Sequence, residues 1–141
     1  MGGSLLGFTA KKCPHHLSPE MLALYHDANW TNYTRKPDRL AKAYEHSLAI
    51  YGAYEKRHLV GLIRVVGDGH SLVVVQDLIV LKSHHRKGIG SALLQLVLDT
   101  YKGCYHIQLL TESSPKTLAF YQAFGLVPVH QLGCTAFILQ S

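Results

Sequence analysis

The spacing of apolar residues changes along the chain from a helical period to a strand-like period and back. In the first third, apolar positions recur every three to four residues, and Ser18 and Pro19 supply the hydroxyl cap and first-turn proline of a helix start. The middle third contains runs rich in Val, Ile, Leu and Tyr, separated by short polar or glycine-containing turns. The pattern predicts, in order, a short strand near Phe8, helices over residues 18–28 and 37–46, strands over residues 48–55, 58–66 and 71–81, a helix over residues 88–101, a strand over residues 105–110, a helix over residues 115–124, and a final strand pair over residues 126–130 and 135–139.

Two segments indicate how these elements pack. Residues 71–81 (SLVVVQDLIVL) are almost continuously apolar, as in a central strand covered on both faces, and their one polar interruption is Gln76-Asp77. The helix over residues 88–101 carries apolar side chains almost all the way round, so we expect it to be buried on more than one side. The chain should therefore adopt an α/β fold with helices around a mixed sheet.

Composition agrees with a single domain. The chain has 141 residues, of which 48% are hydrophobic and 16% are charged. A chain of this size and composition buries enough surface to fold without a disulfide or metal staple, so residues 1–141 are expected to form one domain. The cysteines at positions 13, 104 and 134 are odd in number and widely spaced, which indicates reduced thiols.

The formal net charge is +5, from 14 Lys and Arg against 9 Asp and Glu. This charge suits an anionic ligand, but the basic residues look scattered and no nucleic-acid-binding motif is present, so no nucleic-acid partner is expected. No stretch approaches the roughly 18 consecutive apolar residues of a membrane span, and the N-terminus lacks the pattern of a secretory signal. The sequence predicts a cytoplasmic protein with no membrane partner.

The most informative motif is HHRKGIGSALL, residues 84–94, between a buried strand and a buried helix. A glycine-rich turn at this place can present several backbone N–H groups at a helix N-terminus, where the helix dipole and the unpaired donors favour a phosphate. Gly88 and Gly90 let the backbone approach without a Cβ clash, and Arg86 and Lys87 add positive charge. The expected ligand is a diphosphate, and the alternative is a tight turn that binds nothing.

Together with its neighbours, this motif resembles the GNAT superfamily of acetyl-CoA-dependent N-acetyltransferases. The family signature is Q/R-x-x-G-x-G/A, and here residues 85–90 read His-Arg-Lys-Gly-Ile-Gly. Both glycines match, whereas His85 stands where the family usually has Gln or Arg. A side-chain contact to the cofactor is then lost or replaced by imidazole, while the backbone cradle is retained.

A second segment, SPKTLAFYQAFGL at residues 114–126, is similar to a later helix of the same family, commonly N-x-x-A-x-x-F-Y-x-x-x-G-F. Phe120, Tyr121 and Gly125 match this pattern. Ser114 replaces the usual Asn, and Leu126 replaces the usual Phe. The resemblance covers the chain from about residue 17 onward.

The resemblance implies a mostly antiparallel central sheet with helices on both faces, acetyl-CoA as co-substrate and a primary amine of a small molecule, peptide or protein as acceptor. It also implies that the backbone of the 71–81 strand binds the pantetheine arm, with the Leu78 N–H stabilising the oxyanion of the tetrahedral intermediate. The residues expected to bind the cofactor are Leu78, Val80, His85, Arg86, Lys87, Gly88, Ile89, Gly90, Ser91, Ser114 and Phe120.

Tyr121 is the implied general acid, since the family tyrosine at this place lies near the thioester sulfur and a phenol is protonated at neutral pH. Its alternative role is a packed aromatic side chain. The glutamate that some members use as a base would fall near Val74, so that arrangement is missing. Asp77, Glu112 and His106 are candidate bases or water relays, each with a structural role as the stronger alternative.

The remaining candidates have structural alternatives of equal or greater weight. The pairs His15-His16 and His84-His85 lack carboxylate or cysteine partners at ligand spacing, so no metal site is expected. Asp68 is expected to serve a turn. Three aromatic residues of the helical first third either line the acceptor pocket or belong to the core; they are Trp30, Tyr33 and Tyr44.

Two further expectations concern activity and assembly. The alternative to an enzyme is a non-catalytic CoA-binding regulatory module of the same fold, suggested by His85, Ser114 and the missing glutamate. The terminal strands can pair between subunits, so a homodimer is one expected assembly.

Overall fold

The computed structural model describes residues 7–140, which form two compact units, one ending at Leu110 and the other beginning at Thr111. The first unit contains β1 (Thr9–Lys12), α1 (Pro19–Asp27), α2 (Thr31–Thr34), α3 (Pro37–Glu45), β2 (Ala49–Glu55), β3 (His58–Gly67), β4 (Leu72–Val80), η1 (Lys82–His84), α4 (Ile89–Thr100) and β5 (His106–Gln108). The second contains α5 (Pro115–Gln122) and η2 (Val129–Leu132). The expectation that residues 1–141 form one domain stays a prediction.

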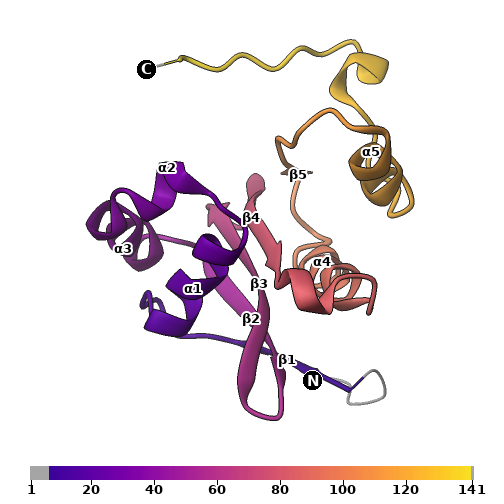
Figure 1. Ribbon diagram of the computed structural model, residues 1–141. Coiled ribbons are helices and arrows are strands. Elements are labelled where there is room, and N and C mark those ends of the chain that lie inside the picture. Colours follow the sequence, from indigo (N-terminus) through magenta and orange to yellow (C-terminus); the bar gives the residue numbers. More distant parts are fainter. Residues whose placement is uncertain (1–6, 141) are drawn as a thin grey trace. The chain divides into compact units, whose positions relative to one another are not determined.

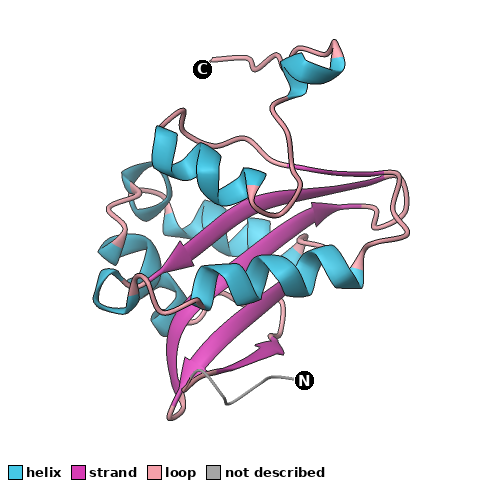
Figure 2. Cartoon of the chain, turned by 90° about the vertical axis from the view of Figure 1, so that its right-hand side faces the viewer, coloured by secondary structure: helices cyan, strands magenta, loops and turns pink. Residues whose placement is uncertain are grey.

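The five strands of the first unit form one sheet in the order β1-β2-β3-β4-β5. The first four are antiparallel to their neighbours, and β5 is parallel to β4. Helices α1 to α3 lie on one face of this sheet and α4 lies on the other (Figures 1 and 2). The predicted α/β fold, a mostly antiparallel mixed sheet with helices on both faces, is confirmed. Among the described residues, no helix is long and apolar enough to cross a membrane.

Helix α1 begins where its sequence predicts. The Ser18 hydroxyl accepts a hydrogen bond from the Met21 N–H at 3.1 Å, and a proline occupies the first turn. The apolar face of the helix carries Leu24 and Tyr25, which pack with Leu40 of α3 and with Ile79 of β4 in one buried cluster. Burial of this face fixes α1 and α3 on the sheet.

Strand β4 contains a bulge that the apolar pattern does not reveal. Arg64 of β3 faces Asp77, whereas the next residue, Val65, faces Val75, so Gln76 is an extra residue on β4. Because Arg64 and Val65 point to opposite faces of the sheet, so do Asp77 and Val75. The bulge therefore turns the Asp77 side chain to the face covered by α1 to α3.

One prediction about secondary structure is wrong, and one short helix was not predicted. The final strand pair is absent from the described residues 126–140, where η2 is the regular element assigned. Residues 135–139 have a strand-like composition, but a strand also needs a hydrogen-bonded neighbour, which composition does not supply. Conversely, the short helix α2 was not predicted, since one turn is too short to show a period.

Asp68 organises the turn before β4, as expected. Its Oδ1 accepts hydrogen bonds from the backbone N–H groups of His70, Ser71 and Leu72 at 2.8, 2.7 and 3.1 Å, and its Oδ2 accepts one from the Ser71 hydroxyl at 2.6 Å. The Ser71 hydroxyl and then the backbone donors hold the pKa of Asp68 well below its ordinary value. The ionised carboxylate therefore stabilises the folded state.

We expect Asp68→Asn to lower the melting temperature at pH 7, since the amide is a weaker acceptor than the carboxylate. The pKa is lower in the folded state, so the stabilisation is complete above the ordinary aspartate value and is lost as the pH falls through the folded value. The difference in melting temperature between the wild type and Asp68→Asn should shrink as the pH falls from about 4 to about 2. Asp38→Asn, at an exposed carboxylate with no side-chain hydrogen bond to a described residue, is the control. A constant gap would contradict this role of Asp68.

Candidate functional site

Strand β5 pairs only with the beginning of β4. Leu72–Val74 is in register with His106–Gln108, and pairing between these two strands ends there. On its other edge, β4 stays paired with β3 as far as Val80. The β5 side of β4 therefore has an open edge over residues 75–80, with backbone donors and acceptors available to a ligand.

Two residues of β4 direct their backbone groups to this open edge. The Leu81 N–H donates to the Val60 carbonyl of β3 at 2.9 Å. Because N–H and C=O groups alternate between the two edges of a strand, those of Leu78 and Val80 point away from β3. The bulge at Gln76 lies just before them. These are the two positions at which the sequence analysis expects a ligand to add like a strand.

The loop after β4 leads into the N-terminus of α4. Arg86 and Gly88 have left-handed φ values of 66° and 82°, and the Gly88 carbonyl accepts the Ala92 N–H at 3.0 Å to begin the helix. Within residues 7–140, no side chain caps this end. The first N–H groups of α4, at Ile89, Gly90 and Ser91, consequently have no partner within the helix, and they can bind an anion.

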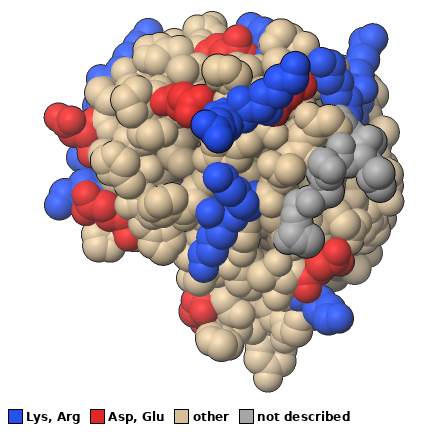
Figure 3. All heavy atoms as spheres, turned by 90° about the horizontal axis from the view of Figure 1, so that it is seen from below, with Lys and Arg blue, Asp and Glu red and all other residues tan. Residues whose placement is uncertain are grey.

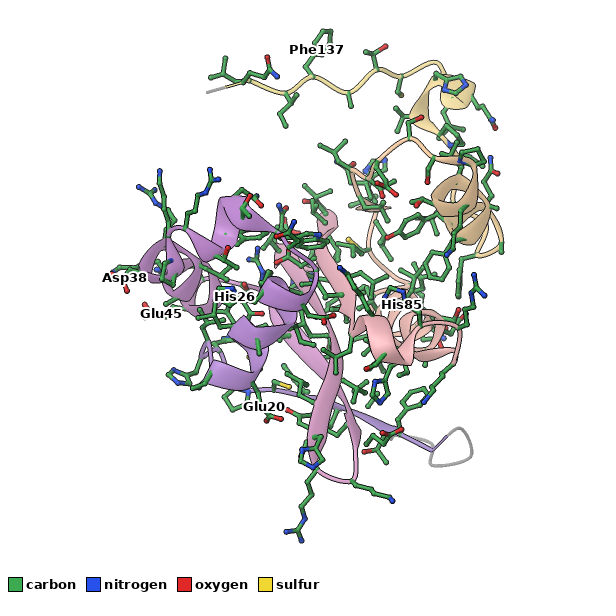
Figure 4. All side chains as sticks on the ribbon, in the orientation of Figure 1. Glu20, His26, Asp38, Glu45, His85 and Phe137 are labelled. Carbon is green, nitrogen blue, oxygen red and sulfur yellow. The ribbon has the colours of Figure 1, made fainter. Side chains whose placement is uncertain are left out.

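His85 bridges the loop and the open edge of β4 (Figure 4). Its Nε2 lies 2.9 Å from the Val80 carbonyl oxygen, one of the groups directed to that edge. His85 occupies the position where the GNAT signature has Gln or Arg. Its exposed imidazole thus covers a backbone acceptor. This contact could not be predicted, because it depends on how the chain turns after Leu81.

The start of the loop is anchored to two other elements. His84 Nε2 lies 3.0 Å from Glu55 Oε1 of β2, and the Lys82 N–H donates to Asp27 Oδ2 of α1 at 2.8 Å. The hydrogen bond with His84 lowers the pKa of Glu55. His84 and His85 therefore have different partners, and in the described part of the chain no three His, Cys, Asp or Glu residues are arranged to hold a metal ion.

Beneath the bulge, Asp77 is the centre of a buried polar network. Its Oδ2 accepts hydrogen bonds from Arg64 Nε at 2.7 Å and from the Tyr25 hydroxyl at 2.8 Å, and its Oδ1 accepts one from the Tyr33 hydroxyl at 2.9 Å. The Tyr44 hydroxyl contacts that of Tyr25 at 2.9 Å. Asp77 is 2% exposed. With both oxygens engaged and no access to solvent, this carboxylate serves structure, which was the stronger alternative for it.

The three aromatic candidates of the helical first third lie in or beside this network. Tyr44 is buried in the core, whereas Tyr33 and Trp30 are half-buried and pack edge-on against Tyr25. Burial raises the pKa values of Tyr25 and Tyr44, so both phenols are protonated at neutral pH. The sequence analysis missed the Arg64–Asp77 pair; opposite charges within two otherwise apolar strands were its available signal.

The second unit holds the other candidates. The Ser114 hydroxyl caps α5 by accepting the Thr117 N–H at 3.2 Å. The side-chain hydroxyls of Ser114 and Thr117 both donate to Glu112 Oε1. Phe120 and Tyr121 pack edge-to-face with ring centres 5.0 Å apart. Burial raises the pKa of Tyr121, and its hydroxyl makes no hydrogen bond to the described residues of its unit. A phenol in this state can donate a proton.

The loop candidates are thus brought together, and the candidates of α5 lie together in the other unit. Leu78, Val80 and residues 85–91 converge on the open end of β4, whereas Ser114, Phe120 and Tyr121 belong to α5. His106 is exposed on β5. The open strand edge and the uncapped helix suit a ligand that has both amide and diphosphate groups.

Comparison with known proteins identifies the family. Residues 16–126 match the Acetyltransferase (GNAT) family. A GNAT-family acetyltransferase from Streptococcus pneumoniae TIGR4 has 42% sequence identity and a TM-score of 0.86, covering 95% of this chain and 98% of that chain. A Staphylococcus aureus protein of 22% identity, covering 94% of this chain and 99% of its own, shares the fold with a TM-score of 0.75.

A curated plant protein gives the same answer over a shorter region. GCN5-related N-acetyltransferase 1, chloroplastic, of Arabidopsis thaliana is 31% identical over 97 residues, which is 66% of this chain. The chain spans 48% of the length of that relative. The sequence motifs, the open strand edge and these similarities agree, and the chain belongs to the GNAT family of acetyltransferases.

Proposed function

We propose that this protein transfers the acetyl group of acetyl-CoA to a primary amine by direct attack. The observation that carries this proposal is the open edge of β4 at Leu78 and Val80 beside the uncapped start of α4. An extended pantetheine arm can add to the first, and a diphosphate can bind the second.

The residues of the loop bind the cofactor through different groups in this proposal. The N–H groups of residues 88–91 face the diphosphate, and the exposed Arg86 and Lys87 supply positive charge without needing fixed geometry. His85 must release the Val80 carbonyl before a pantetheine amide can use it. The assignment of Ser114 and Phe120 to cofactor binding rests on the family resemblance and stays a prediction.

Acetyl transfer then needs few side chains. The neutral amine attacks the thioester carbon, and the Leu78 N–H stabilises the resulting oxyanion. When the carbon–sulfur bond breaks, Tyr121 donates its proton to the leaving thiolate, and the new ammonium group loses a proton to water. Asp77 is excluded as the base because Arg64 and two tyrosines occupy its oxygens.

We expect Tyr121→Phe to lower kcat by roughly a hundredfold, the usual size of a general-acid contribution, with little change in acetyl-CoA affinity. Thiol release with a panel of amines measures the first quantity, and calorimetric titration with CoA measures the second. Phe124→Leu, a change in a neighbouring ring of the same aromatic group, controls for packing. Full activity of Tyr121→Phe would remove this residue from the mechanism.

Thiol release with the panel of amines also distinguishes an enzyme from a regulatory module that only binds CoA. The second function is favoured by the His85–Val80 contact, which covers part of the cofactor edge. It predicts a rise in melting temperature with acetyl-CoA but no acceleration of thioester loss by any amine in the panel. Turnover with at least one amine would decide for the enzyme.

A further inference from the structure

We propose that the hollow at the α2–α3 corner binds an acidic peptide segment next to the amine that is acetylated. Six residues line this hollow of about 660 Å³, which we call the basic groove; they are Arg35, Lys36, Pro37, Asp38, Arg39 and Lys42. The inference rests on the proposed function, and it specifies the acceptor as a peptide whose amine has carboxylates nearby.

The charge of the basic groove is concentrated and unpaired. Four cations and one carboxylate give the lining a net charge of +3, against +5 for the whole chain. All five charged side chains are exposed, and none of the four cations forms an ion pair with a described residue. The expectation that basic residues are scattered is wrong at this corner, because α2 ends at the residue before Arg35 and α3 follows at once.

On the face shown in Figure 3, Lys and Arg lie among Asp and Glu. A nucleic acid is normally bound along an extended basic stripe with stacking aromatic side chains, and the groove lining contains no aromatic residue. A short peptide suits the groove better, since its carboxylates can pair with the cations while Asp38 accepts a peptide N–H.

The basic groove is connected through α2 to strand β4, which carries the proposed oxyanion donor Leu78. Helix α2 is tied to β4 through Tyr33, whose hydroxyl donates to Asp77 Oδ1, and Leu78 is the next residue of that strand. Arg35 follows Tyr33 by two residues. A chain that enters along α2 can therefore pass from the cations of the groove toward the β4 bulge.

The basic groove is separate from the proposed cofactor phosphates. Asp38, on α3, and His85, before α4, lie on opposite sides of the sheet in Figure 4. The loop of residues 85–88 carries its own cations, Arg86 and Lys87, beside the α4 N-terminus. The groove charges are consequently free for a second anionic ligand, which in this proposal is the acceptor peptide.

The test uses two variants of the full chain with equal changes in net charge. Arg39→Glu/Lys42→Glu reverses two groove cations, and Lys12→Glu/Lys102→Glu reverses two exposed cations elsewhere. The substrates are two series of peptides with a free N-terminal amine, one with a Glu pair moved stepwise along residues 2–8 and one with Gln in its place. Initial rates with saturating acetyl-CoA and fluorescence anisotropy of the same peptides are measured for each protein.

We expect the groove variant to raise KM for the best Glu peptide by roughly tenfold, the size of a few solvent-screened charge contacts, with kcat unchanged. The matched variant and the Gln peptides should show little change, and the effect should weaken in high salt. Equal binding of Glu and Gln peptides by the wild type, or preferential binding of a single-stranded oligonucleotide, would overturn the proposal. If no peptide is acetylated, anisotropy still tests peptide binding by the groove, while thiol release with the amine panel tests the proposed function separately.

Discussion

Asp77→Ala should lose about 3–5 kcal/mol of unfolding free energy, the cost of removing one partner of a buried ion pair. The side chains of Arg64 and Asp77 are only 4% and 1% exposed, and their atoms are 2.7 Å apart. Burial disfavours the guanidinium charge, but the adjacent carboxylate outweighs it and raises the pKa of Arg64. Without Asp77, this charge and two tyrosine hydroxyls remain buried without their acceptor.

A loss of this size is a large part of the 5–15 kcal/mol that typically stabilises a domain. Urea unfolding followed by circular dichroism measures it. The control is Arg64→Met/Asp77→Leu, which removes both charges with side chains of similar length and should recover much of the loss. If Asp77→Ala were as stable as the wild type, the buried Arg64–Asp77 pair would not contribute to the stability of the fold.

Most elements of the fold could be predicted from local sequence patterns. The Ser18 cap, the turn at Asp68 and the apolar run before the loop each act within a few residues, so the elements around them were predicted with small errors at their ends. The bulge at Gln76 was not predicted. A single polar pair within an apolar strand does not show which residue is extra, since that depends on the register with β3.

The candidate site divides in the same way. Gly88 was identified from the sequence because the glycine-rich turn and the helix that follows it are local patterns, and the structure adds that Gly88 is left-handed. The His85–Val80 contact and the Tyr33–Asp77 bond join residues that only the fold brings together. The four cations of the basic groove lie close together in the sequence, within residues 35–42, but the sequence does not show that the turn between α2 and α3 arranges them around one hollow.

Gly88→Val should weaken acetyl-CoA binding by roughly a hundredfold or more, the loss of about two charge-assisted hydrogen bonds. Gly88 has a φ of 82°, which a β-branched residue adopts only with strain, so the loop is expected to rearrange. The first N–H groups of α4 would then no longer converge on one point. Calorimetric titration of the variant with CoA measures the loss.

The matched control is Gly69→Val, because Gly69 has a nearly equal φ of 80° and lies in the turn at the other end of β4. Both substitutions strain the backbone and should lower the melting temperature. Only Gly88→Val should also weaken CoA binding, since only it changes the start of α4. Equal CoA affinity in the two variants would mean that the α4 N-terminus does not bind the diphosphate, and the proposed acetyl transfer would lose its structural basis.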